Sequence, residues 1–131
     1  MRRDQDDIVV NLNALVNNVQ NYMGWWYFRY GEYQMVYIPY NDSSKTLRIC
    51  IPHFANVEEY DSEQLTTAIN ETNREVRYVK VIILGNGSIS INYDHKIVDN
   101  VDVSSIVQHM LNTLYLTANH LKNKILEKSL F

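Results

Sequence analysis

The sequence predicts an α+β domain with a five-stranded antiparallel sheet, elements in the order α-β-β-β-α-β-β-α, and the first and last helices packed on one face. Three observations support this prediction. Apolar residues recur at helical spacing near both ends of the chain. Between them, aromatic and β-branched runs are joined by short glycine-containing turns, which make the joined strands antiparallel neighbours. The length of 131 residues is that of one domain, so a single domain is expected over residues 1–131.

A first helix is predicted over residues 8–22. Its apolar residues recur every three or four positions and share one side of the helix: Ile8, Leu12, Leu15, Val16 and Val19. Gly24 follows as the expected stop, because glycine adopts the backbone conformation that ends many helices. Several asparagines lower the helix propensity of this segment, so packing must stabilise it.

Two strands rich in aromatic residues come next, WWYFRY and YQMVYIPY, separated by Gly31-Glu32. A glycine at the first central position is typical of a two-residue hairpin turn. A third strand is predicted over residues 46–53, where apolar and polar residues alternate. The crowded tyrosines and tryptophans have an ordinary explanation, since aromatic side chains pack well on a pleated sheet. The alternative is an aromatic binding surface.

The central helix is expected to begin after Asp61, whose carboxylate can cap it, and to run to about Arg74. One stripe is set for burial: Leu65, Ala68, Ile69 and Thr72. A second stripe, Thr66, Asn70 and Asn73, is polar but uncharged. Solvated helix faces usually carry charges, so this stripe favours burial against a hydrogen-bonding surface: a loop, a sheet edge or a second copy of the chain. The alternative is a plain solvated face.

A long strand over residues 76–84 follows this helix. It is continuously apolar after Lys80, which predicts a strand covered on both faces at one end. Asn86-Gly87 then gives a strong hairpin signal. The next strand, over residues 88–94, alternates apolar and polar residues, so one of its faces is expected to be solvated.

The last helix is predicted to start at Asp102 or Ser104. Its stripe is the most regular in the chain and consists of Val103, Val107, Met110, Leu114, Ala118, Leu121 and Ile125. Such a long amphipathic helix must bury its apolar side, most simply on the sheet.

Composition narrows the class of protein. Hydrophobic residues make up 46% of the chain and the net charge is −3, which fits a globular domain and disfavours nucleic acid as a partner. Cys50 is the single cysteine, which fits a reducing compartment. No apolar run approaches the roughly 18 residues of a membrane span. A cytoplasmic protein without a membrane partner is therefore expected.

No catalytic, cofactor-binding or metal-binding set stands out. Cys50 and His53 lie three apart on a predicted strand and point to opposite faces, which makes them a poor nucleophile–base pair. Asp94, His95 and Asp99 follow the last strand and fit an exposed polar loop. The alternative is a hydrolase or metal site at these three residues.

The segment LTTAINETNREVRYVKVIILGNGSISINY, with the order of elements, resembles the YbjN family, whose fold is similar to that of type III secretion chaperones. The matching features are the asparagines Asn70 and Asn73, a strand containing Lys80, a turn at Gly87 and an alternating strand, within residues 8–125. The resemblance implies a small cytoplasmic protein without an established reaction. The chaperone relatives dimerise through the middle helix and its neighbouring strand and bind extended polypeptide. Carried over, this implies a candidate interface formed by Thr66, Asn70, Asn73, Val79 and Val81.

The function expected from these observations is a non-enzymatic protein-binding, chaperone-like or regulatory domain that acts as a homodimer, with no cofactor. The alternative is a regulatory domain that holds a small apolar ligand between sheet and helices, in a void lined by Trp25, Tyr27 and Met110.

Overall fold

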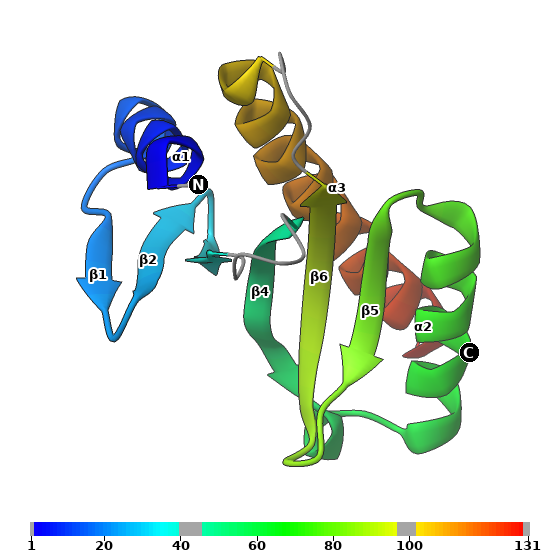
Figure 1. Ribbon diagram of the computed structural model, residues 1–131. Coiled ribbons are helices and arrows are strands. Elements are labelled where there is room, and N and C mark those ends of the chain that lie inside the picture. The colour runs from blue at the N-terminus through cyan, green and yellow to red at the C-terminus, as the bar shows by residue number, and fades with distance from the viewer. Residues whose placement is uncertain (1, 40–45, 97–101, 130–131) are drawn as a thin grey trace.

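The computed structural model describes residues 2–39, 46–96 and 102–129, which form three α-helices and one six-stranded antiparallel sheet (Figure 1). The strand order is β1-β2-β3-β4-β6-β5. The elements are α1 (Arg2–Leu15), β1 (Gln20–Tyr22), β2 (Trp25–Tyr30), β3 (Tyr33–Ile38), β4 (Thr46–Asn56), α2 (Ser62–Glu75), β5 (Val79–Ile83), β6 (Ser88–Lys96) and α3 (Val103–Ser129), with a 3-10 turn at Val57–Glu59. The α+β class and the antiparallel sheet are confirmed.

The prediction of five strands is wrong, because the first helix ends early. Helix α1 stops at Leu15, and Asn18 takes a left-handed backbone conformation with φ of 58°. The chain then forms β1, which pairs with β2. Asparagine is a poor helix former that tolerates left-handed backbone, so the segment predicted as the last helical turns reverses direction instead.

Gly24 is a turn residue and not a helix stop. Met23 and Gly24 both have positive φ, 52° and 87°, between the paired residues Tyr22 and Trp25. Two consecutive positive φ values define the type I′ turn, which matches the twist of the two strands. Asparagine or glycine usually occupies the first central position, so a methionine there is strained.

We expect Met23→Asn to raise the free energy of unfolding by about 0.5–1 kcal/mol, because asparagine adopts the left-handed conformation with less strain. Urea unfolding monitored by circular dichroism measures the change. Met23→Ala is the matched control: it removes the same side chain but keeps the strain. Equal stability of the two variants would contradict this account of the turn.

One hydrophobic core lies between the sheet and the helices. Helix α1 packs against α3, α3 crosses β4 and β6, and α2 packs against α3 beside β5. Large side chains from the helices and the sheet are fully buried in it, among them Leu12, Phe28, Tyr37, Ile91 and Met110. The first and last helices thus share one core with the sheet, as their apolar stripes predict.

The other elements follow the sequence signals closely. The β2–β3 hairpin turns at Gly31-Glu32, and α3 begins at the expected position. Strand β4 runs on to Asn56 through an irregularity between Ile51 and Ala55. Strand β5 is shorter than predicted, because Val76 is the C-cap of α2 and Tyr78 has a positive φ of 72°.

The polar face of β6 is not solvated as predicted. Ser88, Ser90 and Asn92 point away from the helices, yet they are only 8%, 4% and 9% exposed. Asn92 lies between Cys50 of β4 and Lys80 of β5 in the pairing register. Small side chains in the middle of a sheet are covered by longer neighbours on the flanking strands, so alternation alone does not establish exposure.

Candidate interface on helix α2 and strand β5

Asn73 closes the outer edge of the sheet. Strand β5 is the last strand and pairs with β6 alone. The Val81 N–H donates to Asn73 Oδ1 at 2.7 Å, and Asn73 Nδ2 donates to the Val81 carbonyl at 2.9 Å. One carboxamide therefore supplies the donor and the acceptor that a neighbouring strand would supply.

The structure separates the five residues of the predicted interface. Val79 and Val81 are core residues, 1% and 3% exposed, so their side chains are not on the surface. Asn73 is half-buried and bonded to β5. Thr66 and Asn70 are exposed on α2. The sheet edge is thus the hydrogen-bonding partner of Asn73, one of the surfaces anticipated for the uncharged stripe.

A run of exposed apolar residues, which the sequence analysis does not predict, completes this surface. Ile82, Ile83 and Leu84 are 40%, 50% and 38% exposed, so the prediction of a strand covered on both faces is wrong at this end. The signal was present as a run of three large apolar residues, but sequence cannot say which element covers them. Three consecutive exposed large apolar residues at the end of an edge strand are unusual for a surface without a binding role.

The apolar run and the uncharged stripe lie at the same edge of the domain. Helix α2 and strand β5 run in opposite directions (Figure 1), and the Asn73–Val81 bonds fix their alignment. One helical turn before Asn73, Asn70 therefore stands near the level of Ile83. We give the name α2–β5 face to the edge of the domain that exposes Thr66, Asn70, Ile82, Ile83 and Leu84. At this edge Ile83 lies on the side of β5 that carries Val79 and Val81, and Ile82 lies on the other side.

The charges of α2 that form ion pairs turn away from this face. Glu71 pairs with Lys128 at 2.9 Å, and Glu75 lies 2.7 Å from His120 and 3.1 Å from Lys124, all on α3. The bond from Lys128 lowers the pKa of Glu71, and the bond from His120, then that from Lys124, lowers the pKa of Glu75. These contacts hold α2 against α3.

Asp94 and His95, two of the three residues of the predicted hydrolase or metal site, do not form a common site. Asp94 makes two bonds to the guanidinium of Arg48, at 2.6 and 2.9 Å, on the face without helices. His95 follows on the other side of the strand and contacts the ring of Tyr93. Asp99 lies outside the described residues. The two described side chains therefore point to opposite faces of β6.

The remaining candidates are also placed by the fold. Burial raises the pKa of the Cys50 thiol to about 12, so it is protonated at neutral pH, and His53 bonds instead to Ser88 at 2.9 Å. Met110 is fully buried in the core. Trp25 is 44% exposed and Tyr27 shares its face of β2, so these three do not line a common void.

Over residues 2–39, 46–96 and 102–129, no group of three or more His, Cys, Asp and Glu side chains is placed to hold a metal ion. Within the same ranges, no helix has the length and apolar character needed to span a membrane.

Comparison with known proteins shows a fold likeness. No family model and no curated protein matches the chain. The fold is similar to the crystal structure of an uncharacterized protein from Methanothermobacter thermautotrophicus, with a TM-score of 0.61 and 13% sequence identity. The match covers 95% of this chain and 98% of that chain, so the likeness extends over nearly the whole length of both. At this identity the likeness concerns the fold alone.

Proposed function

We propose that this chain is a non-enzymatic protein-binding domain, chaperone-like or regulatory, that acts as a homodimer formed through the α2–β5 face. The exposed run Ile82-Ile83-Leu84 is the observation that carries the proposal. Large apolar side chains gathered on a polar-rimmed surface mark sites of protein association. The resemblance to the YbjN family and to secretion chaperones, and a cytoplasmic location, belong to the same proposal.

A second copy of the chain is the partner that suits this face. In a two-fold dimer both copies use the same patch, so a patch that carries charges of a single sign repels its own copy. Thr66, Asn70 and the apolar run are all uncharged and bring no such repulsion. Asn73 already bonds the N–H and carbonyl of Val81. A second copy is therefore expected to pack through side chains and not to add a strand to the sheet.

A polypeptide partner would contact the β1–β2 hairpin. Its tip exposes Tyr22, Met23 and Trp25, which are 66%, 85% and 44% accessible. Residues 17–28 contain no charged side chain. The cores of protein interfaces are enriched in tryptophan, tyrosine and methionine and depleted of charged residues, and the tip of this hairpin has the same composition. The hairpin lies at the opposite end of the sheet from β5 and stays free in the proposed dimer.

Sedimentation equilibrium at micromolar concentration tests the dimer. We expect the native chain to sediment as a dimer, and Ile83→Glu to raise its dissociation constant by about 100-fold, because a carboxylate would be buried opposite its copy. Asn70→Asp should weaken the dimer less than Ile83→Glu does. Val10→Glu is the matched control, since Val10 is 66% exposed on α1 at the far end of the sheet. A monomeric native chain, or equal effects of Ile83→Glu and Val10→Glu, would remove the α2–β5 face from the proposal.

A further inference from the structure

A groove separates the end of α2 from the middle of α3. Its volume is about 360 Å³, near the lower end of the range for small-molecule sites. Val76, Tyr78 and Leu116 give it apolar walls, and Glu75, Arg77, His109 and His120 give it polar ones. Leu116 is 64% exposed although it is a large apolar residue in the middle of a helix. The groove therefore combines apolar surface with one guanidinium, that of Arg77, and other hydrogen-bonding groups.

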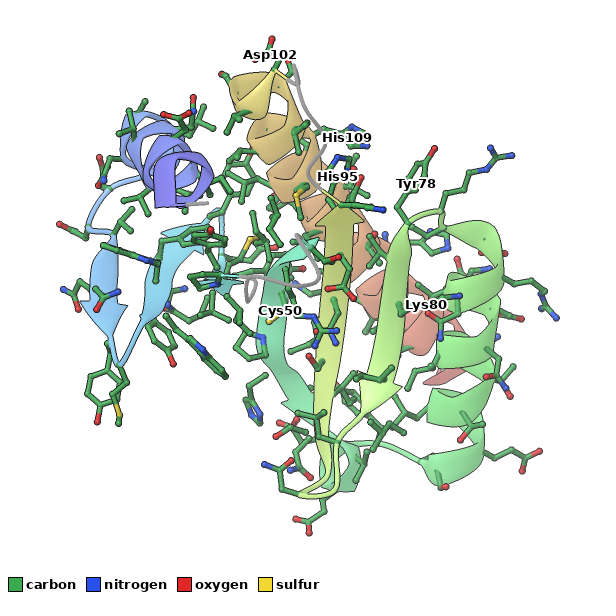
Figure 2. The ribbon with its side chains drawn as sticks, in the orientation of Figure 1. Cys50, Tyr78, Lys80, His95, Asp102 and His109 are labelled. Carbon is green, nitrogen blue, oxygen red and sulfur yellow. The ribbon has the colours of Figure 1, made fainter. Side chains whose placement is uncertain are left out.

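Tyr78 forms an aromatic platform at this groove. Its φ of 72° is rare for a bulky residue, and such strained positions gather at functional sites. The Tyr78 ring stacks on Tyr93 with centroids 6.1 Å apart and planes at 15°, and His109 meets both rings edge-on. Figure 2 shows Tyr78 and His109 beside the upper ends of β5 and β6. Because Tyr78 is 68% exposed, its second ring face remains open.

Arg77 is the group of the groove that suits an anion. The carboxylate in the lining, Glu75, is already bonded to His120 and Lys124, at 2.7 and 3.1 Å. Among the described residues, Arg77 has no ion-pair partner, and its guanidinium presents the fork that suits a carboxylate. Helix α2 ends at Glu75, so the negative end of its dipole lies close by. A monoanion is therefore better matched than a doubly charged phosphate.

We propose that this groove binds a small aromatic carboxylate. Its ring stacks on the open face of Tyr78 and contacts Leu116, and its carboxylate pairs with Arg77. The site is independent of the proposed dimer, because none of its lining residues belongs to the α2–β5 face. It also differs from an interior ligand site, since the groove opens at the surface between the two helices.

NMR titration of the full chain with 2-naphthoate, and with the neutral 2-naphthamide, tests this site. We expect saturable binding of naphthoate with shifts centred on Tyr78, His109 and Leu116. Arg77→Gln should weaken naphthoate at least about fivefold and leave naphthamide unchanged, because only the carboxylate uses the guanidinium. Tyr78→Asn should weaken both ligands, and asparagine keeps the left-handed backbone, so the fold is preserved.

Arg74→Gln is the matched control, because Arg74 is exposed near the end of α2, three residues from Arg77, but does not line the groove. It should leave the affinity for naphthoate unchanged. Three results would each overturn the proposal: no saturation with naphthoate up to about 5 mM, the same loss of affinity in Arg77→Gln and Arg74→Gln, or shifts that spread over the core instead of the groove.

Discussion

Asn73→Ala is expected to lower the free energy of unfolding by about 2 kcal/mol, because two hydrogen bonds to Val81 are lost together. Alanine is a better helix former than asparagine, so α2 itself is not weakened. The loss of unfolding free energy therefore measures the contribution of the bonds at the sheet edge. Urea unfolding with a constant m-value measures it. Removal of the carboxamide also frees the N–H and carbonyl of an edge strand, so light scattering should show more self-association of the variant.

Asn70→Ala provides the comparison for Asn73→Ala. Asn70 lies on the same stripe, one turn earlier, but it is exposed. At protein concentrations where the chain is monomeric, we expect its substitution to change stability by less than about 0.5 kcal/mol, as at ordinary surface positions. If both alanine variants were equally stable, the bonds between Asn73 and Val81 would not be what closes this edge.

Gly31→Ala is expected to destabilise the chain by about 3 kcal/mol. Gly31 turns the β2–β3 hairpin with φ of +61°, where a side chain is strained by about 1–2 kcal/mol. An added Cβ would also collide with the ring of Tyr115 on α3, and overpacking of this kind adds about 1–3 kcal/mol. That ring is held edge-on by Tyr30 and Tyr33, with centroids 6.0 and 5.7 Å away, and cannot easily move.

Two variants separate strain from collision at this turn. Gly85→Ala is the control, because its added Cβ meets nothing within 4 Å and its φ is not in the strained region, so little change is expected. In a double-mutant cycle, Tyr115→Leu should recover part of the loss caused by Gly31→Ala, since it removes the colliding ring. An additive double variant would show that backbone strain alone accounts for the effect.

The two edges of the sheet limit the addition of a further strand in different ways, and this bears on the proposed dimer. At β5 the Asn73 carboxamide blocks strand addition, while Ile82, Ile83 and Leu84 remain exposed. At the other edge, β1 is only three residues long, which limits pairing with another chain. Association through the α2–β5 face would therefore end at two copies, because neither edge offers a long template for a growing sheet.

The elements that the sequence determined by itself are those specified by local chemistry. Asp61 caps α2, with its carboxylate 3.0 Å from the Gln64 N–H, as its position before an apolar stripe predicts. The hairpins at Gly31 and at Asn86-Gly87 form where glycine permits the turn. The period of the last helix reappears as one buried stripe on α3. In each case the cause lies within a few residues of the effect.

Only the tertiary structure decided the features of the candidate interface. The sequence predicts a hydrogen-bonding partner for Asn73 but leaves open whether it is a loop, a sheet edge or another chain, and the fold selects the backbone of Val81. Strand β1 exists because β2 is beside it to pair with, although its own sequence also fits the end of a helix. The apolar run at Ile83 is exposed because no described element covers it there. Exposure and pairing depend on which distant segments become neighbours, and no local pattern contains that information.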